Sequence, residues 1–502
     1  MKLHNTDYNC REAHNGDSLV LTLQQTVTVS NGNYGRAVYL RNSKDNSEVK
    51  VSRGIRHWAW AGTGLYLNKG PNDPSTDLNC SLIQSSFQPG DILHASELAI
   101  QDAPLAALQI AQSLMLSSAE FHTANVNARS TQTRQDPFSI SSQNRKYKAI
   151  VVVFMNGGAD SWNFLVPNSE CKHAGEDFDL YGEYANLRAA AALPRGEMLL
   201  VNSPNDRARN KQPCTGYGVN PALANIKKLY NDGDAAFIAN IGTMVEPLTR
   251  DEYEKRKKRY PAALFGHNTQ QRTSKSVHAG TAKKPKGILG RIQEALTEQQ
   301  YPYAAAAYSM HGVQNIFDGK YQPYIIGGSG VETLSDVFKH KQYLKQMLDK
   351  ESDHGFCEAY SHLLNRSIEE SDHLGGILAS TTHKPIHFAG ASSSIEREMK
   401  NVASVILARK DTKNEREVFY VEYGGFDSHF SALRRGTDVY NRVVSVDKAI
   451  KQMEEEMKAE GIWDDVLIVS SSDFGRKLVG NGGGTDHAWG GHYFLAGGAV
   501  RG

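Results

Sequence analysis

Short, continuous apolar runs punctuate the chain from residue 146 onward. The clearest is AIVVVFM at residues 149–155, and similar runs lie at 235–241, 418–423 and 466–469. Runs of this length without polar alternation are typical of strands that are buried on both faces of a largely parallel sheet. We therefore expect these four segments to lie in one central sheet.

Amphipathic segments separate these runs. Asn220 and Pro221 suit a helix N-cap and first helical position, and Gly233 suits a C-terminal cap. Farther on, apolar residues recur at helical spacing in 395–406 and 443–457. Alternating strands and helices predict right-handed parallel crossovers, so the expected fold class is α/β with a mostly parallel sheet.

The amino-terminal part lacks this rhythm. Residues 21–40 alternate loosely around Asn31-Gly32, which predicts a β-hairpin. Residues 125–145 are rich in Ser, Thr, Gln and Arg, which favours an exposed linker. We therefore expect three parts: an irregular amino-terminal region at 1–124, interpreted as the remnant of a second domain, a linker at 125–145, and the main domain at 146–502.

Composition narrows the class of protein. The net charge of +1 gives no reason to expect binding to nucleic acid, and no apolar run is long enough for membrane insertion. The polar start has no signal-peptide core, an incomplete beginning of the chain is one interpretation of this, and the compartment stays open. Five cysteines without a CxxC pair exclude a zinc ribbon. The basic run 255–259 is interpreted as a solvated helix face.

Metal-competent side chains follow three of the apolar runs. Asp160 comes after the first, Asp427 and His429 after the third, and Asp473 after the fourth. Parallel strands bring their carboxyl ends to one sheet edge, where ligands bind in open α/β sheets. The alternative is that these aspartates only cap helices or turns.

The loop after Asp473 adds further candidates. Asp486 and His487 are adjacent there, and Arg476 offers a planar fork that matches a tetrahedral oxyanion. Mixed carboxylate and imidazole ligands suit zinc, manganese or iron, so one or two divalent ions, zinc or manganese first, are expected. Two ions would clamp a phosphoryl or sulfuryl group of a small anionic ester.

A set of motifs carries a family resemblance. In chain order they are VVVFMNGGADSWNFLVP, IANIGTMVEPLT, LFGHNTQ, GILGRI, FYVEYGGFDSHF, SDFGRK and GTDHAWGGHYFLAGGAV. Together they resemble the domain of unknown function 1501 family of the alkaline phosphatase-like superfamily, over residues 146–502. The resemblance implies an α/β/α sandwich related to sulfatases, and relatives continue beyond the position of Gly502.

The resemblance also implies site roles. It assigns metal binding to Asp160, Asp427 with His429, Asp473 and the late His487. Phe474 stands where the wider superfamily has a histidine, so a second metal site would lack one ligand. Asn163, His267 and His492 lie in the same motifs and are secondary candidates.

The superfamily's hydroxyl or modified cysteine nucleophile has no secure match here. Ser161 and Thr269 are the candidates, the latter on a segment, 264–271, that is predicted to be a polar loop. A hydroxyl in a polar loop is more often a cap or turn former. Arg476 is expected to bind the equatorial oxygens of the ester.

Three functions remain open: a metal-dependent hydrolase of phosphate or sulfate esters, a non-catalytic binding or assembly module on the same fold, and a nucleotide-dependent oxidoreductase. The last is weakest because Gly157-Gly158 does not fit GxGxxG spacing. Residues 86–124 faintly resemble the end of domain of unknown function 1800, so a partner of that kind is a further expectation.

Overall fold

The computed structural model divides into two compact units. One comprises Met1–Phe138 and Thr333–Asp372, and the other Ser139–Glu332 and His373–Gly502. The structure describes residues 19–30, 33–42, 48–52, 83–85, 92–95, 116, 118, 141–173, 176–203, 212–280, 285–328, 330–331, 341–351 and 355–500. Apart from short strands, the region resembling domain of unknown function 1800 and most of the predicted linker therefore lie outside the described residues.

The first unit contains a five-stranded antiparallel sheet in the order β3-β2-β1-β5-β4. Its strands are β1 (Leu19–Ser30), β2 (Asn33–Asn42), β3 (Glu48–Ser52), β4 (Ile83–Ser85) and β5 (Ile92–Ala95). Strands β1 and β2 pair with Ser30 opposite Asn33, which confirms the predicted hairpin. This region is thus more regular than the sequence suggested.

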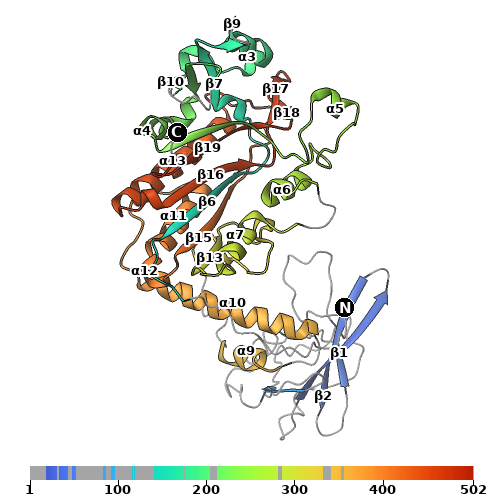
Figure 1. Ribbon diagram of the computed structural model, residues 1–502. Coiled ribbons are helices and arrows are strands. Elements are labelled where there is room, and N and C mark those ends of the chain that lie inside the picture. The colour runs from blue at the N-terminus through green and yellow to red at the C-terminus, as the bar shows by residue number, and fades with distance from the viewer. Residues whose placement is uncertain are drawn as a thin grey trace. The chain divides into compact units, whose positions relative to one another are not determined.

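The second unit is built on a seven-stranded sheet in the order β12-β19-β16-β6-β15-β13-β14 (Figure 1). The strands are β6 (Lys148–Met155), β12 (Ala235–Ile241), β13 (Ala305–Ser309), β14 (Tyr324–Ile325), β15 (Arg416–Tyr423), β16 (Val466–Ser472) and β19 (Gly491–Ala496). Strand β6 is central and runs parallel to both β15 and β16. The four apolar runs therefore share one sheet, as predicted. Strand β12 is not the buried strand that its sequence indicated, because it lies at the sheet edge, pairs antiparallel with β19 and is exposed from Ile238 to Ile241.

Side chains of β6 alternate between two apolar layers. Val151, Val153 and Met155 belong to one hydrophobic cluster, whereas Val152 and Phe154 belong to another. Because both faces of the strand are buried, polar alternation is absent from its sequence. The result is an α/β/α sandwich with a mostly parallel sheet, the predicted fold class.

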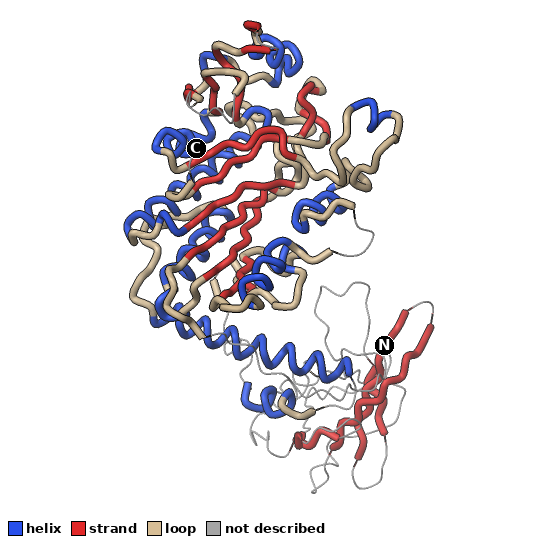
Figure 2. The backbone as a smooth tube through the Cα atoms, in the orientation of Figure 1, coloured by secondary structure: helices blue, strands red, loops and turns tan. Residues whose placement is uncertain are grey.

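Helices cover both faces of the sheet (Figure 2). The larger cluster includes residues of α4 (Ala224–Asp232), α11 (Ser394–Leu407) and α13 (Asp438–Ala459), and the smaller one includes residues of α7 (Ile288–Thr297). The Asn220 side chain caps the turn before α4 by accepting from the Ala222 N–H group, and Gly233 ends α4 with φ of 84°. Both predicted helix signals are confirmed.

The structure contains further helices and strands outside the two large sheets. They are β7 (Leu165–Ser169), β8 (Lys172–His173), β9 (Glu176–Asp177), α3 (Leu180–Arg188), β10 (Leu199–Asn202), β11 (Gly216–Val219), α5 (Arg250–Glu254), α6 (His267–Ser276), α9 (Lys341–Leu348), α10 (Gly355–Ser380), α12 (Arg409–Thr412), β17 (Arg476–Gly480) and β18 (Thr485–His487). A disulfide joins Cys171 to Cys214, a pairing that the sequence had left open. None of the described helices is long and apolar enough to cross a bilayer.

Residues 267–276 and the described end of the linker differ from the sequence prediction. Residues 267–276 form helix α6 instead of a polar loop. The described end of the predicted linker is anchored, because Glu415 accepts hydrogen bonds from the backbone N–H groups of Gln143 and Arg145 at 2.8 and 2.9 Å. The Arg145 guanidinium also pairs with Glu415 at 2.8 Å. Residues 142–145 are therefore part of the second unit.

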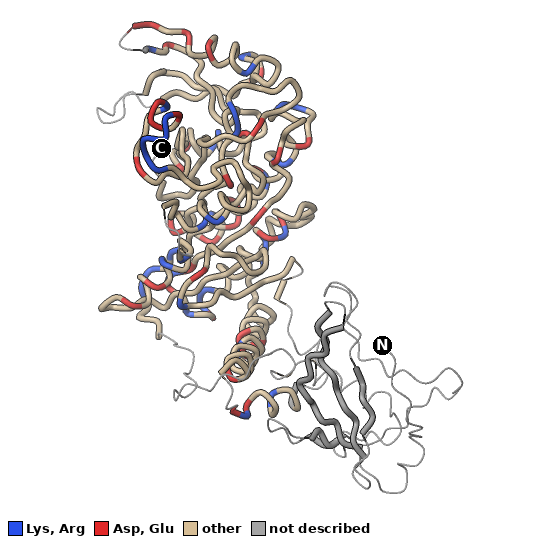
Figure 3. The backbone as a smooth tube through the Cα atoms, turned by 90° about the vertical axis from the view of Figure 1, so that its right-hand side faces the viewer, with Lys and Arg blue, Asp and Glu red and all other residues tan. Residues whose placement is uncertain are grey.

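Charged residues of both signs are interspersed along the second unit (Figure 3). In the basic run, Lys257 pairs with Asp251 at 3.0 Å and Lys258 with Glu252 at 3.1 Å. These side chains are at least partly exposed, as predicted, but the run follows α5, which ends at Glu254, and therefore does not lie on a helix face.

One buried carboxyl group in the sheet is held by neutral hydrogen-bond donors. Glu417, on β15, is 1% exposed and accepts hydrogen bonds from the hydroxyl groups of Tyr147 and Tyr308 and from the Asn414 amide. Burial outweighs these hydrogen bonds and raises the pKa of Glu417 to about 7.

This raised pKa predicts a loss of stability with rising pH. Below the ordinary pKa of 4.5, Glu417 is protonated in both the folded and the unfolded chain; between that pH and about 7, only the unfolded chain releases the proton. The free energy of unfolding should thus fall by up to about 3 kcal/mol between pH 5 and pH 8. In urea denaturation, Glu417→Gln should remove this fall, whereas Glu254→Gln, on the exposed face of α5, should keep it. Equal pH dependence in both variants would contradict the assignment.

Candidate metal centre at the carboxyl edge of the sheet

Three neighbouring strand ends meet at one edge, as the sequence predicted. Asp473 follows β16 and Asp427 follows β15, on either side of the glycines that follow β6. The Gly157 N–H group donates to Asp473 Oδ1 at 3.2 Å. A Cβ at Gly157, where φ is 123°, would lie 2.4 Å from the Asp427 nitrogen. Glycine is thus required here because the loops after β6 and β15 touch.

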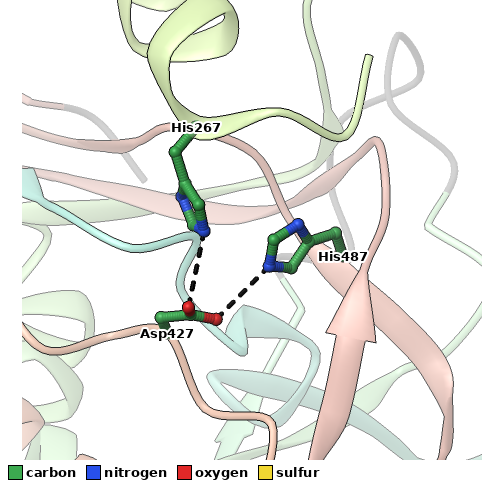
Figure 4. A group of neighbouring side chains, drawn as sticks. All are labelled: His267, Asp427 and His487. Atoms are coloured by element: carbon green, nitrogen blue, oxygen red, sulfur yellow. Dashed lines mark hydrogen bonds and ion pairs between the residues drawn. The ribbon is translucent and has the colours of Figure 1, made fainter. Parts of the chain in front are cut away.

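Three imidazoles surround the Asp427 carboxylate, and Figure 4 shows those of His267 and His487. His429 Nε2 and His487 Nε2 lie 3.1 and 3.3 Å from Asp427 Oδ1, and 2.9 Å from each other. His267 Nε2 lies 3.5 Å from the other oxygen, Oδ2. Ligand atoms of His267, Asp427 and His487 all lie within 4.8 Å of one another.

Each imidazole is held by its other ring nitrogen. The three contacts are His267 Nδ1 to Asp473 Oδ2 at 2.8 Å, His429 Nδ1 to Asp486 Oδ1 at 3.4 Å, and His487 Nδ1 to the Phe265 carbonyl oxygen at 2.7 Å. A carboxylate or carbonyl oxygen only accepts, so these contacts place the proton on Nδ1 and leave a lone pair on Nε2. Metal-binding histidines are held in this way.

These donors fit a divalent cation. Bonds of about 2.0–2.1 Å in a tetrahedral zinc site place the ligand atoms roughly 3.3 Å apart. The contacts of His429 and His487 with Asp427 Oδ1 have this spacing. Two Nε2 lone pairs 2.9 Å apart would repel each other, and a cation between them converts the repulsion into attraction.

Arg476 was predicted to face the site and bind an oxyanion. The structure shows that it holds Asp427 in place instead. Its guanidinium is fully buried and donates to Asp427 Oδ1 at 2.9 Å, to the Thr485 carbonyl at 3.0 Å and to the Gly157 carbonyl at 3.2 Å. All three nitrogens are turned toward protein acceptors, so the proposed grip on an oxyanion is corrected to a positioning role. Burial acts to raise the pKa of Asp427, but the Arg476 charge outweighs it and lowers that pKa.

Asp160 does not contact the imidazoles, contrary to its expected role as a metal ligand. Its oxygens pair with both terminal nitrogens of Arg188, at 2.9 and 2.7 Å, and both side chains are 0% exposed. The Leu433 N–H group donates to the same carboxylate. Because Asp160 is the counter-ion of a buried arginine, we assign it a structural role.

Asp473 and Asp486 also differ from their expected roles. Each contacts the Nδ1 atom of a histidine instead of facing Asp427 directly. Hydrogen bonds from Asn481 lead the causes that lower the pKa of Asp486. Both aspartates therefore orient imidazoles from behind.

Neither candidate hydroxyl nucleophile faces the centre. Ser161 is fully buried, and its Oγ accepts a hydrogen bond from the His492 N–H group at 2.9 Å. Thr269 lies two residues after His267 on α6, and residues at this spacing point to opposite sides of a helix.

The secondary candidates have different outcomes. Asn163 is buried and structural, donating to the Ala191 and Leu433 carbonyls at 2.9 and 3.0 Å. His492 Nδ1 accepts from the Asn240 N–H group, and burial lowers the pKa of His492 to about 4. His267 alone moves from a secondary position to the centre of the site.

Gln271 is a site residue that the sequence reasoning missed. Its amide donates to Asp473 Oδ2 at 3.0 Å and to Asn156 Oδ1 at 2.8 Å. His267 and Gln271 are four residues apart and therefore share one face of α6. The four-residue spacing of His267 and Gln271 was visible in the sequence. It indicates a shared face only if the segment 264–271 is recognised as the start of a helix.

Lys275 continues the same face of α6. It is 4% exposed and pairs with Glu422 on β15 at 3.2 Å. Burial lowers the pKa of Lys275. Polar residues spaced by four thus fix α6 over the strand ends.

Phe474 forms an aromatic wall of the centre. Its ring lies 4.9 Å from the His267 ring and 4.7 Å from the His487 ring, measured between centroids. A Cβ at Gly158 would lie 2.3 Å from this ring. Phe474 thus packs against the two imidazoles and offers no metal ligand, at a position where the resemblance led us to expect a histidine.

Three solved structures show distant likeness. They are Ps i-CgsB (13% identity, TM-score 0.27, 70% of this chain and 66% of that chain), the lipoteichoic acid synthase LtaP from Listeria monocytogenes (12%, 0.23, 70% and 60%) and the PsFucS1 sulfatase from Pseudoalteromonas sp. (14%, 0.29, 72% and 64%). The chain thus spans at most 66% of the length of these three structures. No curated protein matches the chain.

A family model gives the firmer result. The model described as protein of unknown function (DUF1501) matches residues 147–502, which is more than half of the chain and agrees with the resemblance seen in its motifs. The chain therefore belongs to the DUF1501 family.

Proposed function

We propose that this protein is a metal-dependent hydrolase of phosphate or sulfate esters. The observation that carries the proposal is the convergence of Nε2 atoms on the Asp427 carboxylate, each on a ring anchored through Nδ1. A cap or turn role for Asp427 would not require three imidazoles at this spacing.

Asp427, His429 and His487 would hold the ion. The two histidines approach the same oxygen of Asp427, whereas His267 approaches the other. A carboxylate with two imidazoles leaves a coordination position for substrate, as in catalytic zinc sites, and it also suits manganese. A bound divalent ion would act as a Lewis acid on the ester oxygen and activate a water.

The surrounding residues keep Asp427 ionised and keep the rings of His429 and His487 oriented toward it. Arg476 lowers the pKa of Asp427, which keeps the carboxylate ionised and fixes its orientation. Asp486 and the Phe265 carbonyl orient the rings of His429 and His487. Phe474, which is 4% exposed, excludes water from one side.

The ester class follows from chemistry and family likeness together. Phosphate and sulfate monoesters are small anions whose transfer step develops charge on oxygens that a divalent ion stabilises. The motifs resemble those of an alkaline phosphatase-like superfamily. Both considerations favour a small anionic ester as the substrate.

A second candidate function is a non-catalytic binding or assembly module. It is favoured by the engagement of Ser161 and Arg476 with protein partners, because the expected nucleophile and oxyanion donor are then unavailable. A module of this kind would retain metal binding without turnover.

Metal binding is the first test of the proposal. The full chain should bind zinc or manganese, measured by metal analysis and calorimetry. His487→Ala should reduce affinity by more than about 100-fold, because loss of a ligand exceeds the 10–100-fold cost of losing an outer partner. His383→Ala, which removes a histidine paired with Glu460, is the matched control and should leave affinity unchanged. Equal affinity in both variants would rule out this centre.

Turnover separates the two candidate functions. The metal-loaded protein should hydrolyse p-nitrophenyl phosphate or p-nitrophenyl sulfate, and a chelator should abolish this activity until metal is restored. Asp486→Asn should weaken metal binding by about 10-fold, because the neutral asparagine side chain orients the His429 ring less well than the Asp486 carboxylate does. Metal binding without turnover of either ester would instead support the binding module.

A further inference from the structure

We propose that His267 is the nucleophile of this site, attacking phosphorus or sulfur through Nε2 and forming a covalent intermediate on the imidazole. The inference rests on the proposed function and identifies the attacking group within it. The chemical class of substrate is an ester with a transferable phosphoryl or sulfuryl group.

The position of His267 around Asp427 separates it from the other two imidazoles. His429 and His487 share Asp427 Oδ1 and lie 2.9 Å apart, as two ligands of one ion would. His267 instead approaches the other oxygen, Oδ2, at 3.5 Å (Figure 4). The ligand atom of His267 also lies within 4.8 Å of those of Asp427 and His487, but Asp427, His429 and His487 already supply the three protein ligands of a catalytic site.

The Nε2 atom of His267 is the reactive nitrogen. Nδ1 is committed to Asp473 at 2.8 Å, and the Asp473 side chain is 0% exposed. The separation of 3.5 Å between Nε2 and Asp427 Oδ2 is beyond the range of a good hydrogen bond. A partly exposed ring with one nitrogen anchored and the other uncommitted has the geometry of an activated nucleophile.

Packing fixes the ring in this orientation. His267 is the first residue of α6, and its ring lies 4.9 Å from Phe474 and 4.5 Å from His487 between centroids. Gln271, one turn later, donates to the same Asp473 oxygen. The pair is therefore preorganised, which lowers the cost of reaching an in-line attack geometry.

Other hydroxyl candidates do not compete for this role. Ser161 is fully buried and bonded to the His492 backbone, and Thr269 lies on the far side of α6. Among the described residues around Asp427, His267 carries the uncommitted lone pair best placed for attack.

The proposed step is balanced as follows. The Nε2 lone pair forms a bond to phosphorus or sulfur while the ester oxygen leaves with its bonding pair and takes a proton from water. The proton on Nδ1 stays in its hydrogen bond to Asp473, whose negative charge offsets the positive charge on the substituted ring. A water oxygen then bonds to phosphorus or sulfur, the bond to Nε2 breaks, and one water proton passes to solvent.

Trapping the intermediate tests the assignment. The metal-loaded full chain is mixed with p-nitrophenyl phosphate or p-nitrophenyl sulfate and quenched in alkaline denaturant, which preserves phosphorus–nitrogen bonds. Intact-mass and peptide analysis should find one phosphoryl or sulfuryl group on His267. His267→Ala should lose the adduct and more than about 1,000-fold of turnover, as expected for a removed nucleophile.

Metal affinity supplies an independent measurement. His267→Ala should bind metal as the unmutated chain does, whereas His487→Ala should not. Thr269→Val should keep both metal and adduct. Loss of metal in His267→Ala would make His267 a ligand and overturn the inference, as would full turnover by that variant. Turnover by the unmutated chain without any adduct would overturn the inference alone, while no turnover of either ester would overturn the proposed function and this inference together.

Discussion

The buried guanidinium of Arg476 is the interaction on which the site depends. It joins three separate segments: the loop after β6 through the Gly157 carbonyl, the loop after β15 through Asp427, and the β17–β18 hairpin through Thr485. Burying a guanidinium is costly unless its donors are satisfied, and here each finds an acceptor. The same cation lowers the pKa of Asp427 and keeps it ionised. One side chain therefore both connects the three segments at the sheet edge and maintains the charge of the carboxylate.

A second buried ion pair supports the same edge from farther back. Asp160 and Arg188 are both fully buried, and Asp160 also accepts from the backbone of Leu433, beyond the loop that carries His429. Removing one member would leave an uncompensated charge in the interior, which typically costs about 3–5 kcal/mol. Asp160 must therefore remain paired with Arg188 and has a structural role, although its position in the sequence suggested a metal ligand.

The apolar runs made the sheet predictable from the sequence. The directions in which the polar side chains point could not be predicted in the same way. Residues 149–155 lack polar alternation because helices cover both faces, so the pattern itself indicated a central strand. The convergence of Asp427 and Asp473 followed from parallel strand geometry alone. By contrast, the partner of Asp160 is an arginine on α3, and no spacing rule in the sequence identifies such a pair. His267 was underestimated because a polar segment without apolar periodicity was taken for a loop, although it begins a helix.

The pairing pattern of β6 also determines when the site can assemble during synthesis. Gly157 and Asp473, which meet through a hydrogen bond, are separated by 316 residues, and the central strand gains both neighbours from the last part of the chain. Contacts of such long range are slow to form, because the loop-closure entropy must be overcome before any pairing compensates for it. Until β15 and β16 emerge from the ribosome, β6 is an apolar strand with two open edges and needs protection from association with other chains. An ion held by Asp427, His429 and His487 would therefore bind only after β15 has been synthesised and the later loop that carries His487 has folded.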